Sequence, residues 1–380
     1  MAENNVSEVV FDAVVIRALM LDRFAEEVQR EIRAILLVLQ HELMNELVDV
    51  DPVGVRAPSY QVRRAQKLFR QVKLTMASSF RDMRKKHELE LKGMMMQEGQ
   101  FMMGAVNRAV GVDVMSVGLS KEQLMALSKE ELINGAPSRD WWKRQEVKLR
   151  ESFMDHVRNG MLRGFSTAEI AGRMKGTASI GFKDGIFKKV GRAIESLVRT
   201  SVINSANSAR LALMKENEDV LSGIQWVSTL DTRTTVICIG LDGKKWDNDL
   251  KPIGHDKEFP GPTAHCGCRS TQIPIVKGFE DQGRFKGKKF REYYEGELRA
   301  QGIPEERIKK MVANTRSSMD GQVSDVTNFP QWFKKQSRAR KVEILGSGRL
   351  ALYEAGLIRL EDLTTSKNRA LTLEELRKKM

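Results

Sequence analysis

All three cysteines of the chain lie in one short stretch, residues 224–274, together with two of its five histidines. Zinc is commonly held by four sulfur or nitrogen ligands in a tetrahedron. Gly267 would allow the tight turn that neighbouring ligands need to reach one ion. The spacing lacks paired C-x-x-C motifs, so two interpretations stay open: a structural zinc site, or a metal-free knot in which His265 bonds a carboxylate such as Asp231 and the thiols are simply buried. The candidate ligands are Cys238, His265, Cys266 and Cys268.

The same residue types raise the question of catalysis. A cysteine beside a histidine could act as a nucleophile, but side chains adjacent in sequence, such as His265 and Cys266, usually diverge. His255, Asp256 and His265 could serve a metal-dependent nuclease, although no H-N-H or paired-carboxylate pattern is present. We therefore expect no enzymatic activity, and keep the metal-dependent nuclease as the alternative.

Local patterns indicate the elements that hold these residues. Alternating residues 224–229 predict a strand, and the carboxylate of Asp231 is expected to accept backbone N–H bonds in the turn that follows. Residues 241–243 (L-D-G) form a turn signal, which predicts a hairpin continuing to Trp246. Residues 271–276 predict a closing strand.

The rest of the chain shows mainly helical periodicity, with apolar residues recurring at spacings of three and four. The predicted class is mostly α with a small α+β module: long N-terminal helices suited to a coiled-coil hairpin, a central helix with a β-hairpin and turns, and a helical C-terminal tail. The predicted domains are 1–138, 139–276 and 277–380. The predicted helices cover residues 6–49, 59–110, 140–160, 166–176, 187–216 and 371–379.

The helix predicted at 187–216 carries a polar face. Its polar residues recur by one, three and four, and a buried polar face needs hydrogen-bond partners. We expect the module that follows to supply them. The residues are Arg199, Thr200, Asn204, Asn207 and Arg210.

The charge balance favours a polyanionic partner. The formal net charge is +13 and the sequence pI is about 9.6, which makes nucleic acid the first candidate. Basic faces at 56–92 and 284–310 could contact DNA phosphates without regard to sequence, or could be ordinary solvated faces. The sequence contains no run of about 18 apolar residues, so we expect no membrane span. Its first residues show no basic region followed by an apolar stretch, so we expect no signal peptide. The candidate DNA contacts are Arg63, Arg64, Lys67, Arg70, Arg84, Lys85, Lys288, Lys289 and Arg291.

A spaced motif runs through the module: W-x-x-T-x-D-x-R-T, a cysteine, L-D-G, and P-x-x-H-x-x-C-R-S. With the preceding helix, it resembles the phage Mu F-like head morphogenesis family of minor head proteins over about residues 140–276, and residues 329–379 look like a tail of many phage versions. Three departures, Thr235, Cys266 and Ser270, stand where relatives often have cysteine, proline and cysteine. Two of them remove candidate metal ligands, which favours the metal-free interpretation. The motif residues that we single out are Arg199, Asn204, Trp226, Asp231, Arg233, Asp242, Gly243 and Arg269.

The resemblance implies a structural role in the virion of a tailed phage. Such proteins are made in the host cytoplasm and lie inside the capsid near the portal vertex. Their implied partners are the portal protein, packaged DNA, and scaffold or major capsid protein, and they assist procapsid assembly, DNA packaging or ejection. A non-specific nucleic-acid-binding protein without an assembly role is a further alternative.

Overall fold

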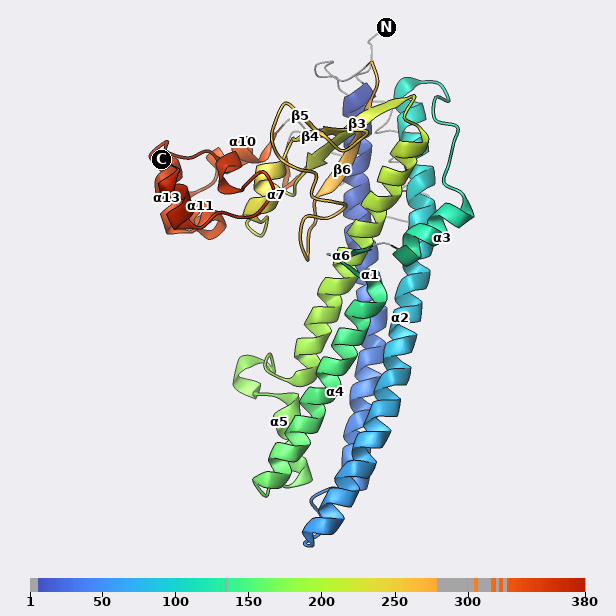
Figure 1. Cartoon of the computed structure of the whole chain (residues 1–380), viewed down its shortest axis with the longest axis vertical. Coiled ribbons are helices and arrows are strands. Elements are labelled where there is room, and N and C mark those ends of the chain that lie inside the picture. The colour runs from blue at the N-terminus through green and yellow to red at the C-terminus, as the bar shows by residue number, and fades with distance from the viewer. Residues whose placement is uncertain are drawn as a thin grey trace. The chain divides into compact units, whose positions relative to one another are not determined.

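The computed structural model describes residues 6–130, 132–133, 135–278, 299, 304–306, 316–318, 321–323 and 327–379. These residues are mostly helical with a small β part, which confirms the predicted class (Figure 1). The chain divides into two compact units, each built from segments distant in sequence. The first unit combines residues 1–23, 93–127 and 202–380, and the second combines 24–92 and 128–201. The predicted boundaries at 138 and 276 do not follow this division, because long helices contribute residues to both units.

The second unit is a bundle of antiparallel helices. Lys86 lies 2.9 Å from Glu31 and Thr75 donates to Glu46, so α1 and α2 run in opposite directions, as the short connection between them requires. Apolar residues at spacings of three and four form one core that includes Leu39, Leu68, Trp142 and Phe153. The helices that contribute to this unit are α1 (Val6–Val50), α2 (Pro58–Val110), α4 (Ser138–Leu162), α5 (Thr167–Lys175) and α6 (Ile186–Glu216).

The first unit contains a four-stranded antiparallel sheet in the order β5-β4-β3-β6. In strand β3, Ile224 pairs with Trp246 of β4 on one side and with Pro274 of β6 on the other. The closing strand forms as predicted, while the first strand begins and ends earlier than predicted. The bounds are β3 (Leu221–Val227), β4 (Lys245–Asp247), β5 (Pro252–Ile253) and β6 (Thr271–Val276).

The predicted hairpin to Trp246 forms, but a short helix, α7 (Val236–Leu241), lies between its strands. Thr235 caps this helix by accepting a hydrogen bond from the backbone N–H of Cys238 at 3.5 Å. Cys238 therefore sits on a helix, which alternation of apolar residues alone did not predict. Trp226 and Trp246 are fully buried and anchor the core beside it.

The C-terminal residues 327–379 form a set of short helices. Their core joins Leu230 and Ile239 of the module to Phe329, Trp332 and Leu363. The predicted tail helix is present, and Thr372 and Glu375 form a capping box at its start. The elements are α10 (Phe329–Lys334), α11 (Arg338–Leu345), α12 (Ser347–Glu354), η2 (Leu360–Leu363) and α13 (Leu373–Lys378).

The remaining short elements complete the described chain. No helix among the described residues is long and apolar enough to cross a membrane. The elements are α3 (Lys121–Glu130), β1 (Leu132–Ile133), β2 (Ala136–Pro137), η1 (Ala178–Ile180), β7 (Arg316–Ser318) and β8 (Gly321–Val323).

Candidate functional site

Three of the four candidate metal ligands meet in the first unit. The Sγ atoms of Cys238 and Cys268 are 3.7 Å apart, and Nε2 of His265 lies 3.1 Å from the Cys238 Sγ. One ligand atom from each residue falls within 4.8 Å of the others. Both cysteines are buried and His265 is half-buried. Residues 30 positions apart in sequence are thus brought to one point.

The turn from His265 to Cys268 sets the orientation of the ring. The Cys268 N–H donates to the His265 carbonyl at 3.1 Å, and Gly267 adopts a φ of 74°, a left-handed conformation that favours glycine. Nδ1 of His265 lies 2.9 Å from the Cys266 carbonyl, an acceptor, so Nδ1 must carry the proton. In the neutral ring, Nε2 therefore presents a lone pair to the Cys238 Sγ.

Cys266 does not join this group. Its side chain is exposed, and the group contains only Cys238, His265 and Cys268 among the described residues. Cys268 is buried while Cys266 is exposed, so the group uses Cys268 and not Cys266. The predicted four-ligand set is therefore corrected to three.

The two thiols affect each other's protonation. The hydrogen bond from the Cys238 thiol lowers the pKa of Cys268 to about 5, even though burial opposes this change. The same hydrogen bond and burial raise the pKa of Cys238. Cys268 is consequently the sulfur that ionises first, and thiolate is the form that binds metal.

These residues fit a zinc ion. Two sulfurs bound at about 2.3 Å to one tetrahedral zinc lie about 3.8 Å apart, and a sulfur and a nitrogen lie about 3.5 Å apart. The observed 3.7 Å and 3.1 Å are close to these values. Cys238, Cys268 and the Nε2 of His265 would hold the ion as three soft ligands. The same distances also suit a metal-free, hydrogen-bonded cluster, so both interpretations from the sequence remain.

Asp231 does not bond His265, which corrects the partner expected for the metal-free knot. Its carboxylate instead accepts two hydrogen bonds from Arg269, at 2.5 Å and 2.7 Å, and one from the Arg233 backbone N–H at 3.0 Å. The predicted turn bond is thus present. The side chain of Arg233 is exposed and lies 3.5 Å from the same carboxylate. A guanidinium can donate two parallel hydrogen bonds to a carboxylate, whereas an imidazole donates one, which explains why Asp231 pairs with Arg269 and not with His265.

Asp242 joins the module to the C-terminal helices. Oδ1 accepts from the Ser228 backbone N–H at 2.8 Å, and Oδ2 accepts from the Phe329 backbone N–H at 2.7 Å. The next residue, Gly243, has a φ of 77°, and its N–H donates to the Trp226 carbonyl at 2.8 Å. The L-D-G turn is therefore a junction as well as a turn.

The polar face of α6 meets the module only in part. Asn204 accepts from the Thr263 hydroxyl at 2.7 Å, and Asn207 donates to the Pro262 carbonyl at 2.7 Å. These contacts confirm that the module supplies partners. Arg199 belongs to the second unit, where it lies 3.8 Å from Glu26.

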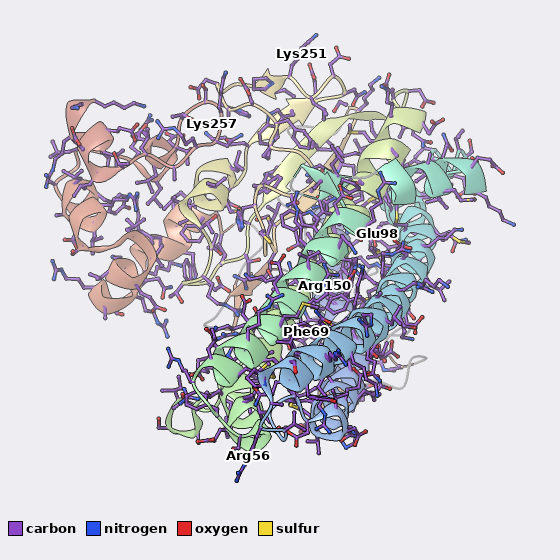
Figure 2. All side chains as sticks on the ribbon, turned by 60° about the horizontal axis from the view of Figure 1, so that its bottom comes forward. Arg56, Phe69, Glu98, Arg150, Lys251 and Lys257 are labelled. Carbon is purple, nitrogen blue, oxygen red and sulfur yellow. The ribbon has the colours of Figure 1, made fainter. Side chains whose placement is uncertain are left out.

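Glu98 was not foreseen as a site residue. It is fully buried on α2, where it accepts from Arg17 at 2.8 Å and from Arg210 at 2.7 Å (Figure 2). Glu98 follows Met94 and Met95 at the spacing of the apolar face. This position in the sequence could have predicted a buried ion pair, because an acidic residue on the apolar face of a helix requires cationic partners.

The sequence pattern did not predict Lys257 as a site residue either. Its ammonium donates to the carbonyls of Thr364 at 2.8 Å and Thr365 at 3.4 Å, and thus ties the loop before the cysteines to the C-terminal segment (Figure 2). Burial lowers the pKa of Lys257. Nothing in its spacing distinguished it from the other lysines.

The candidate DNA contacts fall into three groups. Arg63, Lys67, Arg70 and Lys85 are exposed on α2. Arg64 donates to the Asp51 carbonyl, and Arg84 pairs with Glu88 at 2.7 Å, so these two arginines take part in local contacts. The basic residues predicted at 288, 289 and 291, namely Lys288, Lys289 and Arg291, lie outside the described residues.

Comparison with protein-family models, curated proteins and solved structures finds no match for this chain.

Proposed function

We propose that this chain is a minor head protein of a tailed phage, located inside the capsid near the portal vertex. The observation that carries the proposal is that the residues of the head-morphogenesis motif interlock into one module. Asp231 with Arg269, Asp242 with Ser228, and the Cys238–His265–Cys268 group each join segments that are distant in sequence. A motif whose members bind one another supports a structural rather than a catalytic role.

The partners proposed are the portal protein, packaged DNA, and scaffold or major capsid protein. Within the second unit, the paired parts of α1 and α2 (residues 24–92) offer a helical surface for docking, with a coiled-coil character in their apolar spacing. The positive charge of +13 supports non-specific contact with packaged DNA. Through these contacts the protein would assist procapsid assembly, DNA packaging or ejection.

The test is to find the chain in particles. Procapsids and virions of the phage that encodes it would be purified and analysed by mass spectrometry, and the portal would be co-expressed with the chain to measure co-purification. The proposal expects the chain in both particles and bound to portal rings. Absence from both particles would leave the proposal without support and favour a nucleic-acid-binding protein with no assembly role.

A pair of variants tests whether the module is needed for assembly. Asp231→Asn removes the charged partner of Arg269, whereas Asp249→Asn alters an exposed pair with Lys251. If the module is needed for assembly, the first variant reduces incorporation into procapsids and the second does not. Equal incorporation of both variants, with the first shown to be destabilised, would argue against a role for the module in assembly.

A further inference from the structure

Five basic side chains form one exposed stripe on the second unit. They are spaced by four, three, eleven and four residues, which places them within about 60° of one another around a helix of 3.6 residues per turn. All five are exposed, and none forms an ion pair with another described residue. We call this set the outer stripe of α2: Arg63, Lys67, Arg70, Arg81 and Lys85.

The outer stripe points away from the bundle. Its neighbours on α2 that contact other helices lie on the opposite side: Lys86 pairs with Glu31, Thr75 donates to Glu46, and His87 accepts from Trp142. The core positions Leu68, Val72, Met76 and Met83 are also on that side. The stripe is therefore free of helix packing within its unit.

Few acidic groups offset this charge. On α2, Glu88 is paired with Arg84, and Glu90 shares Lys86 with Glu31 of α1. Asp82 is exposed beside the stripe. The face is consequently positive over its whole length, which favours a polyanion.

The stripe has the length of one turn of a DNA duplex. Arg63 and Lys85 are separated by about 33 Å along the helix axis at 1.5 Å per residue, and one turn of B-DNA is about 34 to 36 Å. The basic residues form two clusters, 63–70 and 81–85, with exposed Leu74 between them. A straight rod laid along a duplex meets the same strand twice, one turn apart, and crosses both grooves and the other strand between these contacts.

We propose that the outer stripe of α2 binds the phosphates of duplex DNA, with the helix lying along the duplex axis and its two end residues, Arg63 and Lys85, contacting one strand about a turn apart. This proposal rests on the DNA contact in the proposed function, and it specifies the surface and the form of DNA. Guanidinium and ammonium contacts with phosphates carry no base information, so binding is independent of sequence.

The experiment measures DNA affinity of the full chain against salt concentration by fluorescence anisotropy. The probes are hairpin-capped duplexes of about 12 and about 6 base pairs, chosen around one helical turn, and a single strand of mixed sequence. The stripe variant replaces all five residues with glutamine, which keeps helix propensity. The control variant replaces five exposed lysines on other elements with glutamine, so both variants lose the same charge: Lys148, Lys183, Lys188, Lys189 and Lys215.

The wild-type slope of log affinity against log salt on the longer duplex should be steeper than that of the stripe variant by about 4 to 5, at about 0.9 per phosphate contact. The control variant should keep the wild-type slope to within about one. On the short duplex, the difference in slope between wild type and stripe variant should be roughly half of that on the longer duplex. Equal slopes for the stripe and control variants would overturn the assignment, as would tighter binding of the single strand through the same residues. Particle incorporation is measured separately, so failure here leaves the assembly role intact.

Discussion

The guanidinium of Arg269 donates two hydrogen bonds to the carboxylate of Asp231, at 2.5 Å and 2.7 Å, across 38 residues. Asp231 lies in the turn after β3, and Arg269 lies just before β6, so the pair closes the segment that carries the cysteines. Their side chains are only 10% and 12% exposed. Because the pair is shielded and bidentate, it contributes more than a surface ion pair.

Replacing Asp231 with asparagine should lower the free energy of unfolding by about 2 to 3 kcal/mol, because Arg269 loses its charged partner in a shielded position. Urea denaturation followed by circular dichroism measures this loss. Asp249→Asn is the matched control: its pair with Lys251 is exposed, and the expected change is below about 1 kcal/mol. A loss for Asp231→Asn as small as that of the control would contradict the role given to the pair.

The same pair predicts a pH dependence. Burial would raise the pKa of Asp231, but the hydrogen bonds and charge of Arg269, with Thr234, outweigh burial and lower it. A lowered folded-state pKa adds stability above the ordinary value of 3.8, and this stability is lost as pH falls through the folded value. The difference in stability between wild type and Asp231→Asn should therefore shrink only below about pH 4.

The sequence predicted the long helices well and the contacts of the module less well. The α1 helix ends at Val50, one residue beyond the prediction, because three-and-four spacing is local information that a helix expresses directly. In contrast, α7 depends on the Thr235 cap and on burial of Ile239 and Leu241, while the helix propensity of its β-branched residues is low. The pairing of Asp231 with Arg269 depends on the path of 38 residues, which no local pattern records.

Zinc binding should depend on three residues and not on the fourth. Zinc retention separates the two interpretations of the cluster: if it holds zinc, then after reconstitution and removal of excess, elemental analysis finds about one ion per chain, the stoichiometry of a single tetrahedral site. Cys238→Ser and Cys268→Ser should abolish retention, while Cys266→Ser should not, because Cys266 lies outside the group. Substituted cobalt would report the thiolate ligands by absorption. A chain that retains neither metal would identify the cluster as metal-free and hydrogen-bonded.

Plasmid cleavage separates the structural proposal from the nuclease alternative. His255 is held by the Lys245 carbonyl at 2.8 Å and the Lys257 N–H at 3.1 Å, and it is not part of the Cys–His group. We therefore expect no cleavage with Mg²⁺, Mn²⁺ or Zn²⁺. Metal-dependent cleavage that His265→Ala abolishes, in a folded variant, would replace the structural proposal with the nuclease.

The buried His87 should make the second unit sensitive to acid. Burial lowers its pKa from 6.5 to about 3, and the Trp142 indole N–H donates to its Nδ1 at 3.2 Å, which fixes a neutral ring. Below pH 6.5 the unfolded chain binds a proton at His87 that the folded chain does not. The free energy of unfolding therefore decreases by about 1.4 kcal/mol for each pH unit of acidification between about pH 6.5 and pH 3. His87→Asn keeps an acceptor for Trp142 and should remove this dependence. His41→Asn, at an exposed position, should leave it unchanged, and a wild-type slope in His87→Asn would contradict the assignment.

Asp242 should control the attachment of the C-terminal helices. Its Oδ2 accepts from the Phe329 N–H at 2.7 Å at the start of α10, and a neutral amide there would weaken a charge-assisted hydrogen bond by about 1 to 2 kcal/mol. In Asp242→Asn, backbone hydrogens of residues 327–379 should therefore exchange faster, while those of α4 keep their wild-type rate, because α4 belongs to the other unit. Lys257→Met, which removes the bond to Thr364 while filling the same space, should accelerate the same segment. Faster exchange throughout both units would instead indicate global destabilisation, and unchanged exchange in 327–379 would show that the apolar core around Phe329 holds the segment without Asp242.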